Sequence, residues 1–145
     1  MDKKKKILEL LNKMNDDSKS VSYEAEQELC GILNGCIKKL RTIEIATHNV
    51  QRSYPEVKSI DSDYGGNIDY LPCTIFYSDE CDDNEYAYVF KTEWLDINEE
   101  EYFNTLLKQT ISHKENLIHN VENSLYQHNL ELADYRKLKF EDLNL

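Results

Sequence analysis

The spacing of apolar residues changes twice along the chain and divides it into three segments. In residues 1–53 and 96–140 apolar residues recur every three or four positions, which is the period of an amphipathic helix. In residues 54–95 they alternate with other residues, as in strands. We therefore expect an α+β fold. N-terminal helices and a long C-terminal helix would pack around a small antiparallel β-meander, as one domain over residues 1–145.

The first segment predicts two helices. One spans about residues 3–15, and its apolar face comprises Ile7, Leu8, Leu11 and Met14. The other begins near Ser22, which can cap a helix, and ends at Tyr54-Pro55. Its apolar residues are spaced alternately by four and three, the heptad spacing of helical bundles. They are Leu29, Leu33, Cys36, Leu40, Ile43, Thr47 and Val50.

Two glycines, Gly31 and Gly35, interrupt the second helix. Each lowers the stability of a helix interior by about 1 kcal/mol relative to alanine. Because they are four residues apart, they share a face, where a neighbouring helix could approach closely. Alternatively, Asn34-Gly35 ends one helix and begins another.

The middle segment predicts three antiparallel strands. The first lies near residues 57–63, and Gly65-Gly66-Asn67 forms a turn into the second, which continues to Tyr77. The third covers Tyr86–Phe90. The connection over residues 78–85 is rich in carboxylates and is expected to be a hairpin loop.

The last helix has the clearest start signal. Asn98 can cap it with Glu101 at the third position, and Ile97 and Tyr102 can form a hydrophobic staple. Its apolar residues include Phe103, Leu107, Thr110, Leu117, Val121 and Leu125, with Leu106, Ile111 and Ile118 beside them. Forty helical residues would span about 60 Å, which is long for a small domain. Together with the second helix, which has a similar reach, this length suggests an antiparallel helical hairpin, which a second subunit could complete in a homodimer formed through the long helices.

Charge is distributed very unevenly. Residues 61–101 contain 13 acidic residues and one lysine, and this segment accounts for the formal net charge of −11. The flanking segments are nearly neutral. The acidic segment is therefore the least random feature of the sequence, and it argues against direct binding of nucleic acid, which requires a basic surface.

The absence of a membrane span or signal peptide, together with the cysteine usage, leads us to expect a cytoplasmic protein. No run of residues approaches the ~20 apolar positions of a membrane span, and the lysine-rich beginning is too polar for a signal peptide. We expect the four cysteines to remain reduced thiols, since nothing indicates a secreted protein.

No motif predicts catalysis, a cofactor or a metal. Residues 61–72 resemble a calcium loop, but Gly65 and Pro72 occupy positions where ligands are required. The cysteine spacings do not fit zinc. Glu44/His48 and Glu115/His119 each place a carboxylate and an imidazole on one helix face, and they would form a metal site only if the two faces met. A metal-dependent enzyme is thus a distant alternative, and we expect no enzymatic activity.

The acidic hairpin is the predicted working surface. Carboxylates interleaved with tyrosines are typical of a surface that attracts and holds a basic partner. We expect a non-enzymatic inhibitor that covers a basic surface of a nuclease or another nucleic-acid-handling protein, with carboxylates in place of phosphates. Toxin-immunity proteins and phage-encoded inhibitors of host defence nucleases act in this way. The predicted contact residues are Asp79, Glu80, Asp82, Asp83, Glu85, Tyr86 and Tyr88. The alternatives are a structural or adaptor helical-bundle homodimer, and a solvated hairpin whose aromatic side chains face the core.

Overall fold

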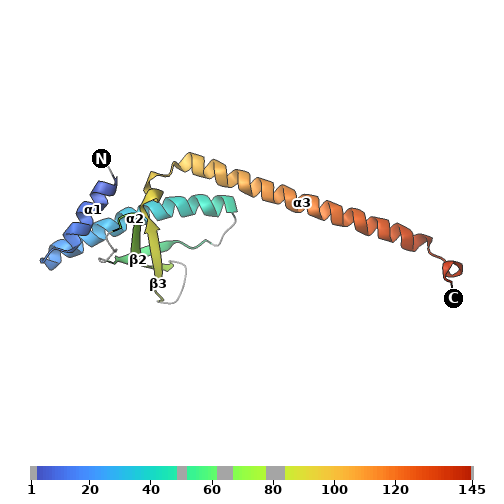
Figure 1. Cartoon of the computed structure of the whole chain (residues 1–145), viewed down its shortest axis with the longest axis horizontal. Helices are drawn as coiled ribbons and strands as arrows, with labels where there is room; N and C mark the ends of the chain where they lie inside the picture. Colours follow the sequence, from blue (N-terminus) through green and yellow to red (C-terminus); the bar gives the residue numbers. More distant parts are fainter. Residues whose placement is uncertain (1–2, 49–51, 62–66, 78–83, 145) are drawn as a thin grey trace. The chain divides into compact units, whose positions relative to one another are not determined.

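The computed structural model describes residues 3–48, 52–61, 67–77 and 84–144. The chain divides into two compact units, residues 1–106 (unit 1) and 107–145 (unit 2), and each is described by itself. The elements are α1 (Lys3–Met14), α2 (Lys19–His48), β1 (Pro55–Ile60), β2 (Tyr70–Tyr77), β3 (Tyr86–Lys91), the 3₁₀ turn η1 (Thr92–Asp96), α3 (Glu99–Lys137) and the 3₁₀ turn η2 (Phe140–Asp142) (Figure 1). The α+β prediction is confirmed, with helices at both ends and an antiparallel meander between them.

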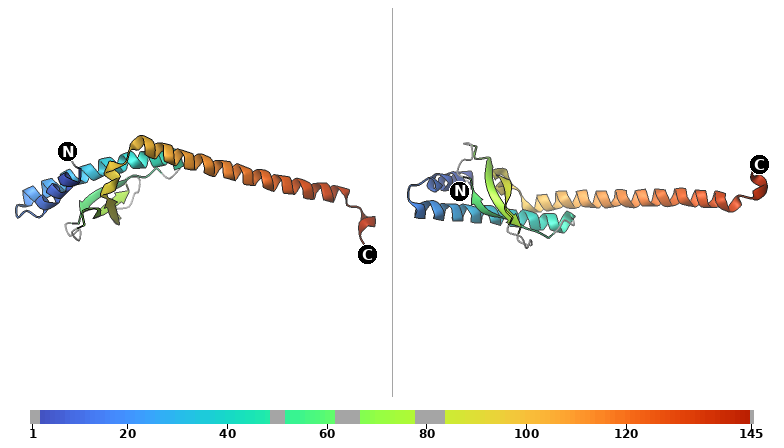
Figure 2. Two further views of the ribbon diagram at one scale, coloured as in Figure 1. Left: turned by 45° about the horizontal axis from the view of Figure 1, so that its top comes forward. Right: turned by 90° about the horizontal axis from the view of Figure 1, so that it is seen from below.

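Helix α1 buries a slightly different face from the predicted one. The buried residues are Ile7, Leu10, Leu11 and Met14, whereas Leu8 is 43% exposed. At about 100° per residue, Leu10, Leu11 and Met14 all lie within about 60° of Ile7, and Leu8 lies about 100° away. Leu8 was therefore wrongly assigned to the core. Both views in Figure 2 show α1 beside the first half of α2.

The cap of helix α2 lies four residues before the predicted one, and the helix begins at Lys19. The backbone N–H of Val21 donates to Ser18 Oγ at 3.5 Å, so Ser18 is the capping residue. The Ser22 hydroxyl donates instead to the carbonyl of Met14 at 2.6 Å, which ties the end of α1 to the start of α2. The helix continues through Asn34-Gly35 to His48, and the predicted break there is wrong.

Asn34 fastens α2 to the sheet. Its side-chain Nδ2 donates to the carbonyl of Val57 at 3.2 Å, and the backbone N–H of Val57 donates to Asn34 Oδ1 at 2.6 Å. The pairing of β1 with β2 shifts register between Val57 and Ser59. The amide of Asn34 thus satisfies both backbone groups of a residue on an edge strand, at a bulge.

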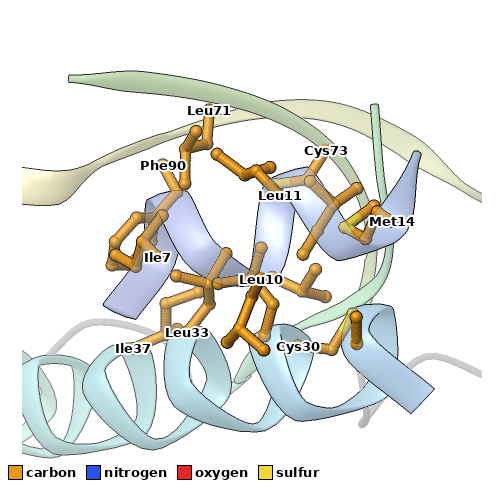
Figure 3. Packing of buried hydrophobic residues seen from close by; sticks show 14 of the residues in the cluster. Ile7, Leu10, Leu11, Met14, Cys30, Leu33, Ile37, Leu71, Cys73 and Phe90 are labelled. Carbon is orange, nitrogen blue, oxygen red and sulfur yellow. The ribbon is translucent and has the colours of Figure 1, made fainter. Parts of the chain in front are cut away.

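The sheet has the order β1-β2-β3 with both pairs antiparallel. Alternation along β2 buries Leu71, Cys73 and Ile75, and Leu71 pairs with the fully buried Phe90 of β3. Figure 3 shows the α1 side chains between those of α2 and those of the sheet. The core of unit 1 therefore lies on one face of the sheet, beneath both helices.

Helix α3 starts at the predicted cap. The backbone N–H of Glu101 donates to Asn98 Oδ1 at 3.0 Å, and the helix runs without interruption from Glu99 to Lys137. Its first eight residues belong to unit 1, and the rest forms unit 2 together with η2. Among the described residues, no helix is sufficiently long and apolar to cross a membrane.

We expect Gly31→Ala and Gly35→Ala each to stabilise unit 1. A Cβ built at either position meets no atom of the described residues within 4 Å, so the close approach that the sequence allowed is not made by any helix that the structure describes in this chain. Each change should raise the free energy of unfolding by about 0.4–1 kcal/mol. Trp94, the single tryptophan, packs in unit 1, and its fluorescence during urea unfolding reports the change. A loss of stability in either variant would contradict the open surroundings of these glycines.

The exchange of Leu8 for Leu10 on the buried face of α1 can be tested with matched leucines. Leu10→Ala should lower the free energy of unfolding by about 2–5 kcal/mol, since Leu10 is 1% exposed. Leu8→Ala has the same effect on helix propensity and should change stability by less than about 1 kcal/mol. Urea unfolding followed by Trp94 fluorescence compares them. Equal losses would show that α1 buries a different face.

Candidate functional site

The predicted contact residues lie partly outside the described structure. Asp79, Glu80, Asp82 and Asp83 are not among the described residues. Glu85 precedes β3, and Tyr86 and Tyr88 are its first and third residues. The structure therefore places three of the seven predicted residues, all at the beginning of β3.

Glu85 is an exposed carboxylate with a cation beside it. Its Oε1 lies 3.3 Å from Lys58 Nζ on β1, and the same ammonium lies 5.1 Å from the ring centroid of Phe76. Exposed ion pairs of this kind contribute about 0–1 kcal/mol. A cation on a partner can therefore replace Lys58 at little expense in stability.

Tyr86 and Tyr88 belong to the buried side of the sheet. Tyr86 pairs with Ile75 and lies edge-on to Tyr77, with 5.6 Å between ring centroids, and it is 37% exposed. Tyr88 pairs with Cys73 and is half-buried, 6.1 Å from the Trp94 ring. Burial, assisted by nearby acidic groups, raises the pKa of Tyr88 to about 12. Only Tyr86 presents a substantial part of its ring to solvent.

A shallow hollow of about 570 Å³ follows β3 and part of β2. It brings Glu85, Tyr86 and Tyr88 together with Asp61, which follows β1. The rest of its lining is Pro72, Cys73, Thr74, Ala87 and Val89. Alternation along β2 and β3 places Pro72, Thr74, Ala87 and Val89 on the outer face of the sheet, opposite Tyr86 and Tyr88. The hollow thus lies along the edge strand β3, with Asp61 and Glu85 among its lining residues.

Every described carboxylate of the acidic segment is exposed. These residues are Asp61, Asp69, Glu85, Glu93, Asp96, Glu99, Glu100 and Glu101. Two of these carboxylates contact lysines of the N-terminal helices. Asp69 Oδ1 lies 3.0 Å from Lys4 Nζ, and Glu99 Oε1 lies 3.6 Å from Lys39 Nζ. The segment therefore keeps most of its negative charge in solvent.

A second site, which the sequence reasoning missed, is an aromatic cleft of about 420 Å³ in unit 1. It lies where α2, the sheet, η1 and the first turn of α3 meet. Its lining comprises Ile37, Leu40, Arg41, Glu44, Pro55, Tyr77, Tyr88, Trp94, Ile97 and Tyr102. Its volume lies within the range of small-molecule pockets.

The polar groups of the aromatic cleft are bonded to one another. Tyr102 donates its hydroxyl to Glu44 Oε1 at 2.7 Å, and Arg41 lies 3.6 Å from the other oxygen of that carboxylate. Arg41 Nε also donates to the carbonyl of Ser53 at 2.9 Å. Burial, and then the bond to Glu44, raises the pKa of Tyr102 to about 12. The network joins α2 to the start of α3. In the sequence, Arg41 and Glu44 are three residues apart on one helix and Tyr102 is a predicted staple residue, but no local pattern connects the two.

The two Glu–His pairs of the sequence analysis lie in different units of the chain. Glu44 is committed to Tyr102 and Arg41. His119 Nε2 lies 3.3 Å from Asn123 Nδ2 in unit 2, and the convergence of the two pairs is not tested. Among the described residues, no group of three or more histidine, cysteine or carboxylate side chains could hold a metal ion.

The described cysteines are free thiols, and Cys30 and Cys73 are buried. Burial raises the pKa of both thiols to about 11. A thiol with a raised pKa is a poor nucleophile near neutral pH, because the thiolate is the reactive form. These two residues act as small apolar groups in the core.

No protein-family model matches this sequence, and neither the curated proteins nor the solved structures compared with it give a significant match. Function must therefore be argued from the residues and their geometry.

The Tyr102–Glu44 bond can be tested by Tyr102→Phe. Removing the hydroxyl should lower the free energy of unfolding by about 1 kcal/mol at pH 7–9. The pKa of Tyr102 in the folded protein, about 12, lies above its ordinary value of about 10. The protonated hydroxyl therefore contributes its full stabilisation below pH 10, and this contribution is lost as the pH rises towards 12. The difference between wild type and variant should shrink over that interval. Trp94 fluorescence in urea measures it.

Tyr23→Phe is the control, because Tyr23 is an exposed tyrosine of α2. This variant should match wild type at every pH. If Tyr102→Phe also matches wild type, the hydrogen bond to Glu44 contributes nothing to stability, and other contacts hold the first turn of α3 against α2 within unit 1.

Proposed function

We propose that this protein is a non-enzymatic inhibitor that binds and covers a basic surface of a nuclease or another nucleic-acid-handling protein. The carboxylates of the acidic hairpin take the place of nucleic-acid phosphates. Toxin-immunity proteins and phage-encoded inhibitors of defence nucleases are small acidic proteins that act in this way. The analogy is one of charge and size, at the level of a functional class.

One observation carries the proposal. Thirteen acidic residues lie in the 41 residues from 61 to 101, and all of those that the structure describes are exposed. A globular protein gains no stability from such a concentration of like charge, because the carboxylates repel one another. A basic partner would relieve this repulsion on binding.

Electrostatics would govern the encounter, and apolar contact would hold the complex. A surface of one sign raises the association rate with an oppositely charged partner, and this effect weakens as salt screens the charges. Both faces of β3 offer apolar contact: the exposed part of Tyr86 on the inner face, and Ala87 and Val89 on the outer face. Tyrosine is enriched among residues that dominate binding energy.

The two tyrosines named from the sequence take different roles in this proposal. Tyr86 is a contact residue because 37% of it is exposed. Tyr88 is a supporting residue, because its ring packs against Trp94 and Cys73. Glu85 contributes a carboxylate once Lys58 is displaced.

A second candidate, the structural or adaptor homodimer, is favoured by one feature of unit 2. Its helix carries many large apolar side chains, and none of them is buried. A single helix cannot bury its own apolar stripe, so this feature indicates a helical partner. The two candidates are compatible, since they use different parts of the chain. The metal-dependent enzyme gains no support from the described residues.

Affinity purification from the native host tests the inhibitor proposal. The baits are full-length wild type, an acidic-hairpin variant (Asp79→Asn, Glu80→Gln, Asp82→Asn, Asp83→Asn) and a control with the same change in charge. The control carries Glu9→Gln, Asp17→Asn, Glu24→Gln and Glu141→Gln, all exposed residues outside the acidic segment. Wild type and control should capture the same basic protein, and the hairpin variant should not.

The captured protein is then purified, and its nuclease or nucleic-acid-binding activity is titrated. Equimolar wild type should abolish that activity, and binding should weaken at least tenfold between 50 and 500 mM salt. The proposal is wrong if wild type and the hairpin variant inhibit equally, or if the captured protein retains full activity in the complex.

A further inference from the structure

A strict heptad repeat begins where unit 2 begins. Ile111, Ile118, Leu125 and Leu132 follow one another at intervals of seven residues. Between them lie Leu107, Lys114, Val121, His128 and Tyr135, so that the spacing alternates between four and three over residues 107–135. Seven of these nine positions are apolar. Four heptads with this pattern meet the length expected of a coiled coil.

Eight of the nine residues of this seam are exposed, and Leu107 is half-buried. Val121 is 67% exposed and Leu125 is 59% exposed. Ile111, Ile118, Leu132 and Tyr135 are also exposed. A stripe that repeats every 3.5 residues drifts by about 20° per heptad around a straight helix. The drift is removed when two such helices wind around each other in a left-handed supercoil, which keeps both stripes in the interface.

We propose that residues 107–135 pair with the same residues of a second copy, in register, as a parallel two-stranded coiled coil. The inference deepens the second candidate function and does not depend on the inhibitor proposal. Ile111, Ile118, Leu125 and Leu132 occupy the a positions, and the other seam residues occupy the d positions.

The two polar seam positions favour the parallel, in-register arrangement. In register, Lys114 meets Lys114 of the second copy and His128 meets His128, and each long side chain can turn its polar end towards solvent. A full-length antiparallel pairing places Lys114 opposite Leu132 and His128 opposite Ile118. A parallel shift by one heptad places Lys114 opposite Val121. Both alternatives set a polar side chain against an apolar one, and single polar core positions specify register in this way.

The charges beside the seam lead to the same arrangement. In a parallel pair, Glu131 (g) lies next to Arg136 (e) of the other copy, and no like charges meet at the other g–e positions. The antiparallel pair places Glu122 opposite Glu122 of the second copy, and Lys108 opposite Arg136 of the second copy. Opposite charges at these positions set the orientation of coiled coils.

The buried area is sufficient for a stable dimer. A large apolar side chain buries roughly 60–120 Å² when it leaves water. Seven such side chains on each copy remove on the order of 1,200 Å² from solvent, which reaches the range of specific interfaces. The opposite face of the helix is mainly polar, with Asn116, Asn123 and Lys137, but it includes Leu130.

Sedimentation of the full-length chain tests the pairing, with two matched leucines. Wild type should be a dimer at micromolar concentration. Leu125→Asn should raise the dissociation constant by about 100-fold or more, because it places an amide in the centre of the seam. Leu130→Asn, at a 46% exposed leucine on the opposite face, should leave the dimer unchanged. Circular dichroism confirms that unit 1 and the helix remain folded in each variant.

A gain of affinity provides a second test, which a misfolded variant cannot imitate. Lys114→Leu and His128→Leu each remove a polar side chain from the seam and should lower the dissociation constant by about tenfold or more. Asn116→Leu, on the opposite face, should not change it.

Orientation is tested by oxidative cross-linking of Ile111→Cys. In the parallel pair the two introduced thiols face each other, and the yield of disulfide-linked dimer should exceed that of wild type severalfold. In an antiparallel pair Ile111 faces Tyr135, and the yield should equal that of wild type. Tyr135→Cys should cross-link like Ile111→Cys.

A monomer at 100 µM, a trimer or tetramer, or equal effects of Leu125→Asn and Leu130→Asn would each overturn the proposal. A dimer without enhanced cross-linking would overturn the parallel arrangement. If wild type stays monomeric but co-purifies with a different coiled-coil protein, the seam binds that protein and not a second copy of this chain, and the proposal is wrong. None of these outcomes would affect the inhibitor proposal, which is tested separately by capture of a basic protein through the acidic hairpin.

Discussion

The fold depends on covering one face of a sheet that is too small to be stable alone. Three strands of six to eight residues require packing against other elements for independent stability. Helices α1 and α2 supply that packing, and their side chains meet Leu71 and Phe90 in the core (Figure 3). Asn34 fixes the position of α2 along β1 by bonding both backbone groups of Val57. The aromatic cleft is lined by residues of both α2 and the sheet, so it depends on this placement of the helix against the strands.

Periodicity predicted the elements well, because each of them buries one face. The three strands and the Asn98 cap followed from alternation and from local capping chemistry. Errors arose where two assignments satisfied the same local pattern. Leu8 and Leu10 both lie near the apolar face of α1, and only the position of the sheet selects Leu10. Asn34-Gly35 resembles a helix end, and the long-range bond to Val57 explains why this asparagine lies within a continuous helix.

The candidate site was predictable as a location but not as a geometry. Charge counting placed the acidic surface in residues 61–101, since net charge needs no knowledge of contacts. Alternation shows that Tyr86 and Tyr88 share a face, but it does not show which face is buried, and that face proved to be the inner one. The aromatic cleft joins Arg41 to Tyr102 across 61 positions of sequence, so no local pattern could reveal it. Half-buried groups with raised pKa values, such as Tyr88 and Tyr102, belong to that cleft.

Charge is separated along the chain in a way that suits both proposals. Residues 102–145 carry five basic and six acidic residues, so pairing through unit 2 meets little net repulsion. In the parallel dimer both acidic segments precede the same end of the coil, and their mutual repulsion is screened beyond about 8 Å at physiological salt. Two inhibitory surfaces on one dimer would bind a dimeric partner, or two neighbouring basic sites, with the second contact made at high effective concentration. The nearly neutral helix would then set the valency of binding, and the acidic hairpin would set its specificity.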